Sequence, residues 1–147
     1  MSSRTWNSQF KTLPNQSLFH EELRKIFCED TLFSHLRCYQ EVDLQELIPE
    51  YKYRQHRFDF YIEEMRCVIE LHGKQHYKRT TFGTLPYSQS LEQFEAIKRR
   101  DSAKKSAAET AGFSYVEIPY TMQRKLTADY IKQRIYGSTN ATDYSKN

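Results

Sequence analysis

The sequence predicts a single domain of the mixed α/β (α+β) class, in which helices flank a mixed β-sheet that contains an antiparallel hairpin. Its 147 residues are enough for one hydrophobic core, and 38% hydrophobic and 14% aromatic residues are typical of a globular chain. Helical and period-two segments follow one another in the order helix, strands, helix, strand, helix. We expect an N-terminal arm over 1–16 that docks on the domain or on a ligand, one domain over 17–137, and a disordered tail over 138–147.

The segment before the hairpin is expected to contain one helix and one strand. The helix begins at Ser17, a residue suited to an N-cap. Glu21 and Glu22 lie near its start, where the helix dipole favours acids, and Glu22 should project from the edge of the apolar face towards the core. Residues 36–44 have the composition of a strand, and residues 45–56 are interpreted as a connection. The apolar face of the helix comprises Leu18, Phe19, Leu23, Ile26 and Phe27.

Two alternating segments, RFDFYI and CVIELH, predict a β-hairpin with a tight turn between them. If these strands pair antiparallel about Glu64 and Met65, Asp59 falls directly opposite Glu70. Residues that face each other in this way have Cβ atoms about 5 Å apart. Two acids at this distance repel unless a proton or a cation neutralises them, so the pair predicts a site for Mg²⁺, with the Leu71 carbonyl as a third oxygen ligand. The alternative is an acidic surface face on a hairpin.

The second half of the chain is expected to supply two more helices and a strand. Residues 77–89 are interpreted as a loop, and Ser90 with Gln93 forms a capping-box start for a helix that ends at Gly112. A strand over 113–118 and a helix over 127–136 follow. On the long helix, Asp101 shares a stripe with apolar residues, so it should point partly inward and require a partner such as a histidine. Lys104, one turn on, either pairs with Asp101 or contacts the site or a phosphate.

His72 and His76 are candidates for a general base or for orienting an attacking water, because imidazole titrates near neutral pH. Their HxxxH spacing also allows a zinc pair with Cys67 nearby, although Gly73 interrupts the regular structure that such spacing needs.

Several separate segments resemble, in order, the restriction-endonuclease-like (PD-(D/E)XK) nuclease superfamily. The closer likeness is to the branch that contains the very-short-patch repair endonuclease and phage homing endonucleases with a Glu, Asp, His, Asp signature. The resemblance covers residues 17–120 and rests on these segments: Asp59-Phe60, Ile69-Glu70, Gly73, Gln75-His76-Tyr77, Arg100-Asp101, Lys104 and Ile118-Pro119-Tyr120.

The resemblance implies a restriction-endonuclease-like core and a Mg²⁺-dependent endodeoxyribonuclease. The enzyme would be phage-type, of the homing, nicking or repair kind, with Mn²⁺ as a substitute for Mg²⁺. It implies that Asp59 is the essential metal ligand and that Glu70 is the acid of the superfamily motif. His72 stands where the usual lysine would be, so the choice of base between His72 and His76 stays open, with His76 preferred. Asp101 matches the last acid of the signature, and Glu22 or Glu21 the first.

Basic residues cluster around the predicted site although the net charge is only +3. This arrangement favours contact with a phosphate backbone, and double-stranded DNA is the expected partner. A non-cleaving DNA-binding protein and a nuclease for RNA or branched DNA are the alternatives, and a homodimer is left open. The residues expected at the DNA are Arg57, Lys74, Lys78, Arg79, Arg100 and Lys104.

Three features of the sequence predict a cytoplasmic protein, in the host cytoplasm if phage-encoded. They are three cysteines without a CxxC pair, no apolar run of membrane-spanning length and no signal peptide.

Overall fold

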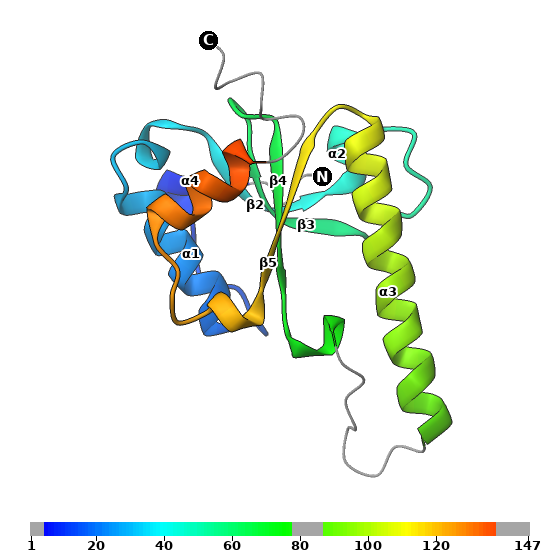
Figure 1. Cartoon of the computed structure of the whole chain (residues 1–147). Coiled ribbons are helices and arrows are strands. Elements are labelled where there is room, and N and C mark those ends of the chain that lie inside the picture. The colour runs from blue at the N-terminus through cyan, green and yellow to red at the C-terminus, as the bar shows by residue number, and fades with distance from the viewer. Residues whose placement is uncertain (1–4, 78–86, 138–147) are drawn as a thin grey trace.

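The computed structural model of the chain describes residues 5–77 and 87–137. In this part, a five-stranded sheet in the order β1-β2-β3-β4-β5 lies between two layers of helices (Figure 1). β4 and β5 are parallel, and the other neighbouring strands are antiparallel. The predicted mixed α/β class is therefore confirmed. The strands are β1 Thr5–Trp6, β2 Cys38–Asp43, β3 Arg57–Ile62, β4 Cys67–His72 and β5 Ser114–Pro119, and the α-helices are α1 Leu18–Glu29, α2 Leu44–Leu47, α3 Tyr87–Thr110 and α4 Ala128–Tyr136.

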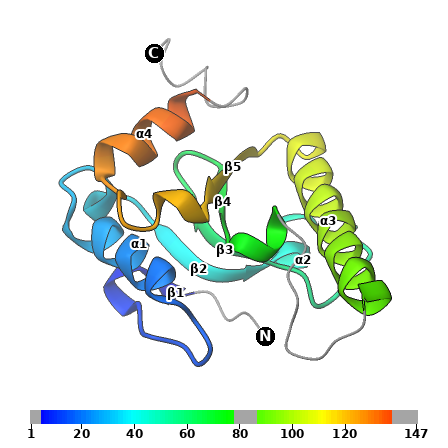
Figure 2. The ribbon, with the colours of Figure 1, turned by 60° about the horizontal axis from the view of Figure 1, so that its bottom comes forward.

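Each face of the sheet buries its own apolar cluster. Helices α1 and α4 cover one face, and α2 and α3 lie on the other (Figures 1 and 2). On the first face, Phe27 of α1 and Ile131 of α4 pack in one cluster with Ile69 of β4. On the second face, Tyr61 and Val68 of the hairpin pack with Ala108 of α3. Because both faces are covered, β4 is buried along its whole length, which matches its near-continuous apolar sequence.

The register of the hairpin agrees with the prediction. Phe60 pairs with Ile69 and Ile62 with Cys67, in antiparallel order. The same register places Asp59 opposite Glu70, just beyond the last ladder pair. This is the point at which polar groups enter an otherwise apolar pair of strands.

Several boundaries differ from the prediction, and the predicted start of the long helix is wrong. α3 begins at Tyr87, so Ser90 is not its N-cap but a buried residue inside the helix. The connection predicted over 45–56 is partly helical, because α2 starts directly after β2. The N-terminal arm docks on the domain: β1 pairs with β2, and the Asn7 amide donates to the carbonyls of Phe33 and Leu36. Most of the predicted loop over 77–89 and the tail over 138–147 lie outside the described residues.

Within 5–77 and 87–137, no helix is both long enough and apolar enough to cross a lipid bilayer.

Candidate functional site

A cleft of about 240 Å³ lies where β3 and β4 separate, and it collects most of the chemically reactive residues that the sequence singles out. α1, the hairpin strands, the turn after β4 and α3 all contribute side chains to it. A larger hollow of about 410 Å³ between residues 48–53 and α3 contains none of the predicted site residues. The lining of the cleft is His20, Asp59, Glu70, Leu71, His72, Gln75, His76, Arg100, Asp101 and Lys104.

Asp59 is held as a carboxylate by hydrogen bonds from two directions. Its Oδ2 accepts the Leu71 amide at 2.7 Å, and its Oδ1 lies 3.3 Å from His20 Nε2. Burial alone would favour the neutral acid, but these hydrogen bonds, the one to His20 first among them, lower the pKa of Asp59 to about 2. Asp59 therefore carries a fixed negative charge at the floor of the cleft.

Glu70 is buried beside this charge, with only 3% of its surface exposed. Its Oε2 accepts the Asp59 amide at 3.2 Å, and its Oε1 forms an ion pair with the Lys104 ammonium. Burial and the charge of Asp59 raise the pKa of Glu70 well above its usual range, and Lys104 opposes that rise only in part. Lys104 thus contacts the site through Glu70, which decides between the two roles predicted for it.

The first helix contributes a histidine rather than the predicted acid. Glu22 and Glu21 are exposed, and Glu22 lies at a separate hollow beside Leu126, outside the cleft. Each helical residue advances about 100° around the axis. The buried side chains of α1 form a stripe, and His20 falls within it, whereas Glu22 lies outside it. The buried residues are Phe19, Leu23, Arg24 and Phe27. Glu22 is therefore not directed towards the core. Leu18, which belongs to the predicted apolar face, is exposed, whereas Arg24 is buried, and this difference turns the buried stripe of α1 towards His20. The apolar pattern of the sequence did not indicate this rotation.

Ser17 explains how His20 is oriented. Ser17 occupies the N-cap position of α1, as predicted, but its side chain makes no capping hydrogen bond. Its hydroxyl instead lies 3.1 Å from His20 Nδ1. A carboxylate can only accept, so His20 Nε2 donates to Asp59 and Nδ1 accepts from Ser17.

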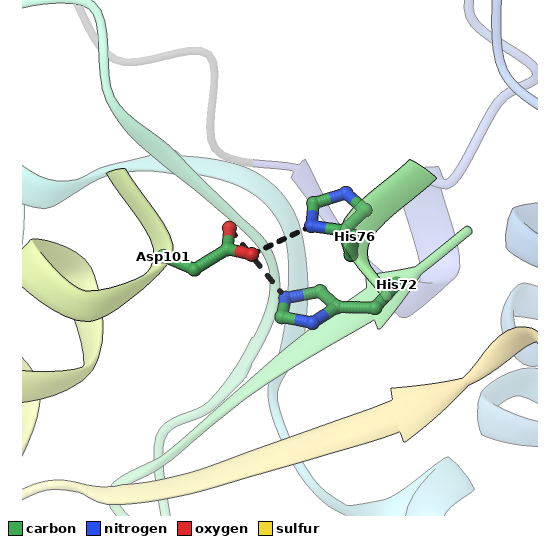
Figure 3. A group of neighbouring side chains, drawn as sticks. All are labelled: His72, His76 and Asp101. Atoms are coloured by element: carbon green, nitrogen blue, oxygen red, sulfur yellow. Dashed lines mark hydrogen bonds and ion pairs between the residues drawn. The ribbon is translucent and has the colours of Figure 1, made fainter. Parts of the chain in front are cut away.

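His72, His76 and Asp101 meet in the wall of the cleft (Figure 3). The imidazole rings of His72 and His76 are stacked, with centroids 4.1 Å apart and planes within 9°. Asp101 Oδ2 accepts a hydrogen bond from His76 Nδ1 at 2.7 Å, so Asp101 points inward to a histidine as its helical position predicts. His72 Nε2 lies farther away, 3.9 Å from Asp101 Oδ1.

Glu117 is a member of this group that the sequence analysis missed. Its Oε2 lies 3.3 Å from His72 Nδ1 and also accepts a hydrogen bond from the Tyr77 hydroxyl. The contact with His72, above all, lowers the pKa of Glu117 to about 2. In the sequence Glu117 is one acid in an alternating strand; only the parallel pairing of β4 with β5, which sets it level with Glu70, brings it to the histidines.

A second acid, Glu41 on β2, also lies near Asp59. The β2–β3 register sets the two opposite each other, and Glu41 has a left-handed backbone conformation with φ of 51°. Burial, followed by the charge of Asp59, raises the pKa of Glu41. Strained backbone at non-glycine residues is concentrated at functional sites, which makes Glu41 a further candidate member.

The structure places only some of the predicted DNA-contacting residues at the cleft. Arg100 and Lys104 line the cleft, whereas exposed Arg57 pairs with Asp43 at 2.8 Å and Lys74 is exposed just after β4. Lys78 and Arg79 lie outside the described residues.

A zinc site that includes Cys67 is not formed. Cys67 is fully buried at the start of β4, and His72 is at its end. Five residues of extended strand span about 17 Å.

The oxygen atoms around Asp59 suit the Mg²⁺ ion that the resemblance implies. In a strand the amide and carbonyl of one residue point to the same side, so the Leu71 carbonyl faces Asp59, to which its amide donates. Asp59, Glu70 and this carbonyl are the hard oxygen ligands that Mg²⁺ prefers. Burial and then repulsion by Asp59 raise the pKa of Glu70, and a divalent cation would offset both by stabilising the charged carboxylates.

Comparisons of the chain with protein-family models, with curated proteins and with solved structures give no match. Its function is therefore inferred from the geometry of the cleft.

Proposed function

We propose that the protein is a metal-dependent DNA endonuclease with a restriction-endonuclease-like core, which hydrolyses phosphodiester bonds in double-stranded DNA as a homing, nicking or repair enzyme. One observation carries the proposal: two facing acids, Asp59 and Glu70, share a cleft with a His76–Asp101 pair. Paired acids beside a base that a carboxylate orients are what metal-assisted hydrolysis requires.

In this proposal Asp59, Glu70 and the Leu71 carbonyl hold the cation. When bound, Mg²⁺ would lower the pKa of a water molecule and offset the charge that develops on the phosphate. His20 keeps Asp59 ionised and fixed in place through its Nε2 hydrogen bond, so the carboxylate is ready for the ion.

His76 is the proposed general base. Because the Asp101 carboxylate can only accept, the proton of His76 sits on Nδ1, and Nε2 has a lone pair for the attacking water. Among the described residues, no group is hydrogen-bonded to His76 Nε2. His72 suits this role less well, since its two ring nitrogens face Glu117 and Asp101.

Arg100 and Lys104 are the proposed phosphate contacts. Both line the cleft on the α3 side, one turn apart on the helix. A scissile phosphate brought to the Asp59 end of the cleft would lie between the carboxylate-held cation and these two positive side chains, a distribution of charge that suits the transition state.

The test is incubation of supercoiled plasmid with purified protein, with and without Mg²⁺ or Mn²⁺. We expect metal-dependent nicking or linearisation that Asp59→Asn and His76→Ala each reduce by about 100-fold or more. The matched controls are Asp129→Asn and His35→Ala, which change exposed residues remote from the cleft and should leave the rate unchanged. Cleavage that survives both site substitutions would refute the assignment. DNA binding without cleavage would indicate a non-cleaving DNA-binding protein, and cleavage of RNA or branched DNA alone would change the substrate class.

A further inference from the structure

We propose that His72, His76 and Asp101 form a second metal site, selective for a borderline-soft divalent transition metal such as Zn²⁺. One donor atom from each residue lies within 4.8 Å of the others, and the Asp101 carboxylate faces both imidazoles (Figure 3). The rings are stacked, so both in-plane lone pairs reach one ion once the partly exposed His76 ring turns out of the stack. Two imidazoles and one carboxylate are a common protein ligand set for zinc, which then keeps a fourth position open.

The distances around Asp101 support a bridging ion. His72 Nε2 and Asp101 Oδ1 are 3.9 Å apart, which is too far for a hydrogen bond. A zinc ion with bonds of about 2.0–2.2 Å to nitrogen and oxygen can join two atoms up to about 4 Å apart. The His76 Nδ1 proton is the one that the ion would displace, because this nitrogen already lies 2.7 Å from the same carboxylate.

Glu117 lies behind His72, on the side of the ring away from Asp101, and holds the ring in position. Its carboxylate lies 3.3 Å from His72 Nδ1 and can only accept, so the His72 proton belongs on Nδ1 and the Nε2 lone pair faces Asp101. A carboxylate behind a histidine ligand orients the ring and increases its basicity. The Tyr77 hydroxyl holds Glu117 in turn. His72 is only 3% exposed, so it is the buried ligand of the site, and the partly exposed His76 is the ligand that adjusts.

The donor atoms distinguish this site from the carboxylate site at Asp59 and Glu70. Nitrogen ligands favour zinc, cobalt and nickel, whereas oxygen ligands alone favour magnesium and calcium. The regulatory effect of such an ion rests on the proposed nuclease function. With Nδ1 bound to zinc, a neutral His76 ring carries its proton on Nε2, so the lone pair proposed to activate water is lost and zinc inhibits Mg²⁺-dependent cleavage.

The binding test uses the full chain, freed of metal with EDTA, without DNA. CoCl₂ is followed by visible absorption and ZnCl₂ by calorimetry. We expect one Co²⁺ per chain, displaced by Zn²⁺, and loss of this binding in both Asp101→Asn and His76→Ala. Glu117→Gln should weaken Zn²⁺ binding by at least about tenfold. His35→Ala, which removes an exposed histidine on another part of the surface, and Asp59→Asn should retain it.

The outcomes separate the two sites and the two proposals. Circular dichroism checks that each variant is folded, and Asp101 and His76, both partly exposed, offer independent tests if one variant fails. Three outcomes would overturn the zinc site. Saturable binding could survive in both Asp101→Asn and His76→Ala, it could be lost only in Asp59→Asn, or the unchanged protein could show no binding. Because Zn²⁺ binding is measured without DNA, it does not depend on cleavage. A protein that binds Zn²⁺ but does not cleave DNA would contradict the proposed nuclease function and leave the zinc site intact. If the zinc site and the nuclease function both hold, Zn²⁺ should inhibit plasmid cleavage over the concentration range in which it binds.

Discussion

At the scale of single residues, the cleft is organised by charges that are buried together. Lys104 is 8% exposed and Glu70 3%, and their ion pair lies next to the ionised Asp59. Taking two charges out of water is unfavourable, and an ion pair in the interior offsets this only while both partners are present. The pair therefore makes the position of Glu70 dependent on a lysine that comes from another element, α3.

Lys104→Met tests this dependence. Methionine keeps an unbranched side chain in place but leaves Glu70 without its cation, so we expect the free energy of unfolding to fall by about 3 kcal/mol near pH 8. The pKa of Glu70 is already raised, and a protonated Glu70 needs no partner, so the loss should shrink as the pH is lowered towards about 5. Urea denaturation at several pH values measures both effects. Lys105→Met, an exposed neighbour on the same helix, should change stability by less than about 0.5 kcal/mol. An equal loss at both pH values would contradict the electrostatic explanation.

At the scale of elements, the end of α3 shows why some features can be predicted from sequence. The Gly112 amide donates to the Glu109 carbonyl at 3.1 Å, and the Phe113 amide donates to the Ala108 carbonyl at 2.9 Å. Gly112 has a φ of +91°, which a residue with a Cβ adopts only with strain. This termination sends the chain into β5 and depends on local chemistry alone, so the glycine in the sequence was sufficient to locate it.

Gly112→Ala should therefore be destabilising for a purely conformational reason. No heavy atom lies within 4 Å of a Cβ built at this position, so nothing clashes, and the strain of the left-handed conformation is the whole effect. We expect a loss of about 1 kcal/mol in the free energy of unfolding, and a smaller one for Gly112→Asn, because asparagine tolerates this conformation better. Thermal or urea denaturation measures the series. Equal losses for alanine and asparagine would show that something other than backbone conformation is responsible.

At the scale of the whole molecule, the site joins segments that are far apart in sequence, and this limits what the sequence can predict. The hairpin register follows from alternation and a short turn, so Asp59 opposite Glu70 was predictable. His20 and Glu117 were not found, because their membership depends on how α1 packs on the sheet and on β5 pairing in parallel with β4. Glu22 is predicted at the site from its place beside the apolar face and from the resemblance, whereas packing of the α1 stripe directs His20 inward instead.

The whole-molecule charge leads to the last prediction, which rests on the proposed function. A net charge of +3 gives little general attraction for DNA, so affinity should depend on the few cations at the cleft. Arg100→Ala removes one of them and should lower the slope of log K against log salt concentration by about 1, as expected for one lost phosphate contact. Fluorescence anisotropy with a DNA duplex in EDTA, where cleavage cannot occur, measures the slope. Lys25→Ala removes an exposed cation of α1 that is not among the residues lining the cleft, and it should leave the slope unchanged. A slope that falls equally in both variants would place the DNA elsewhere on the surface.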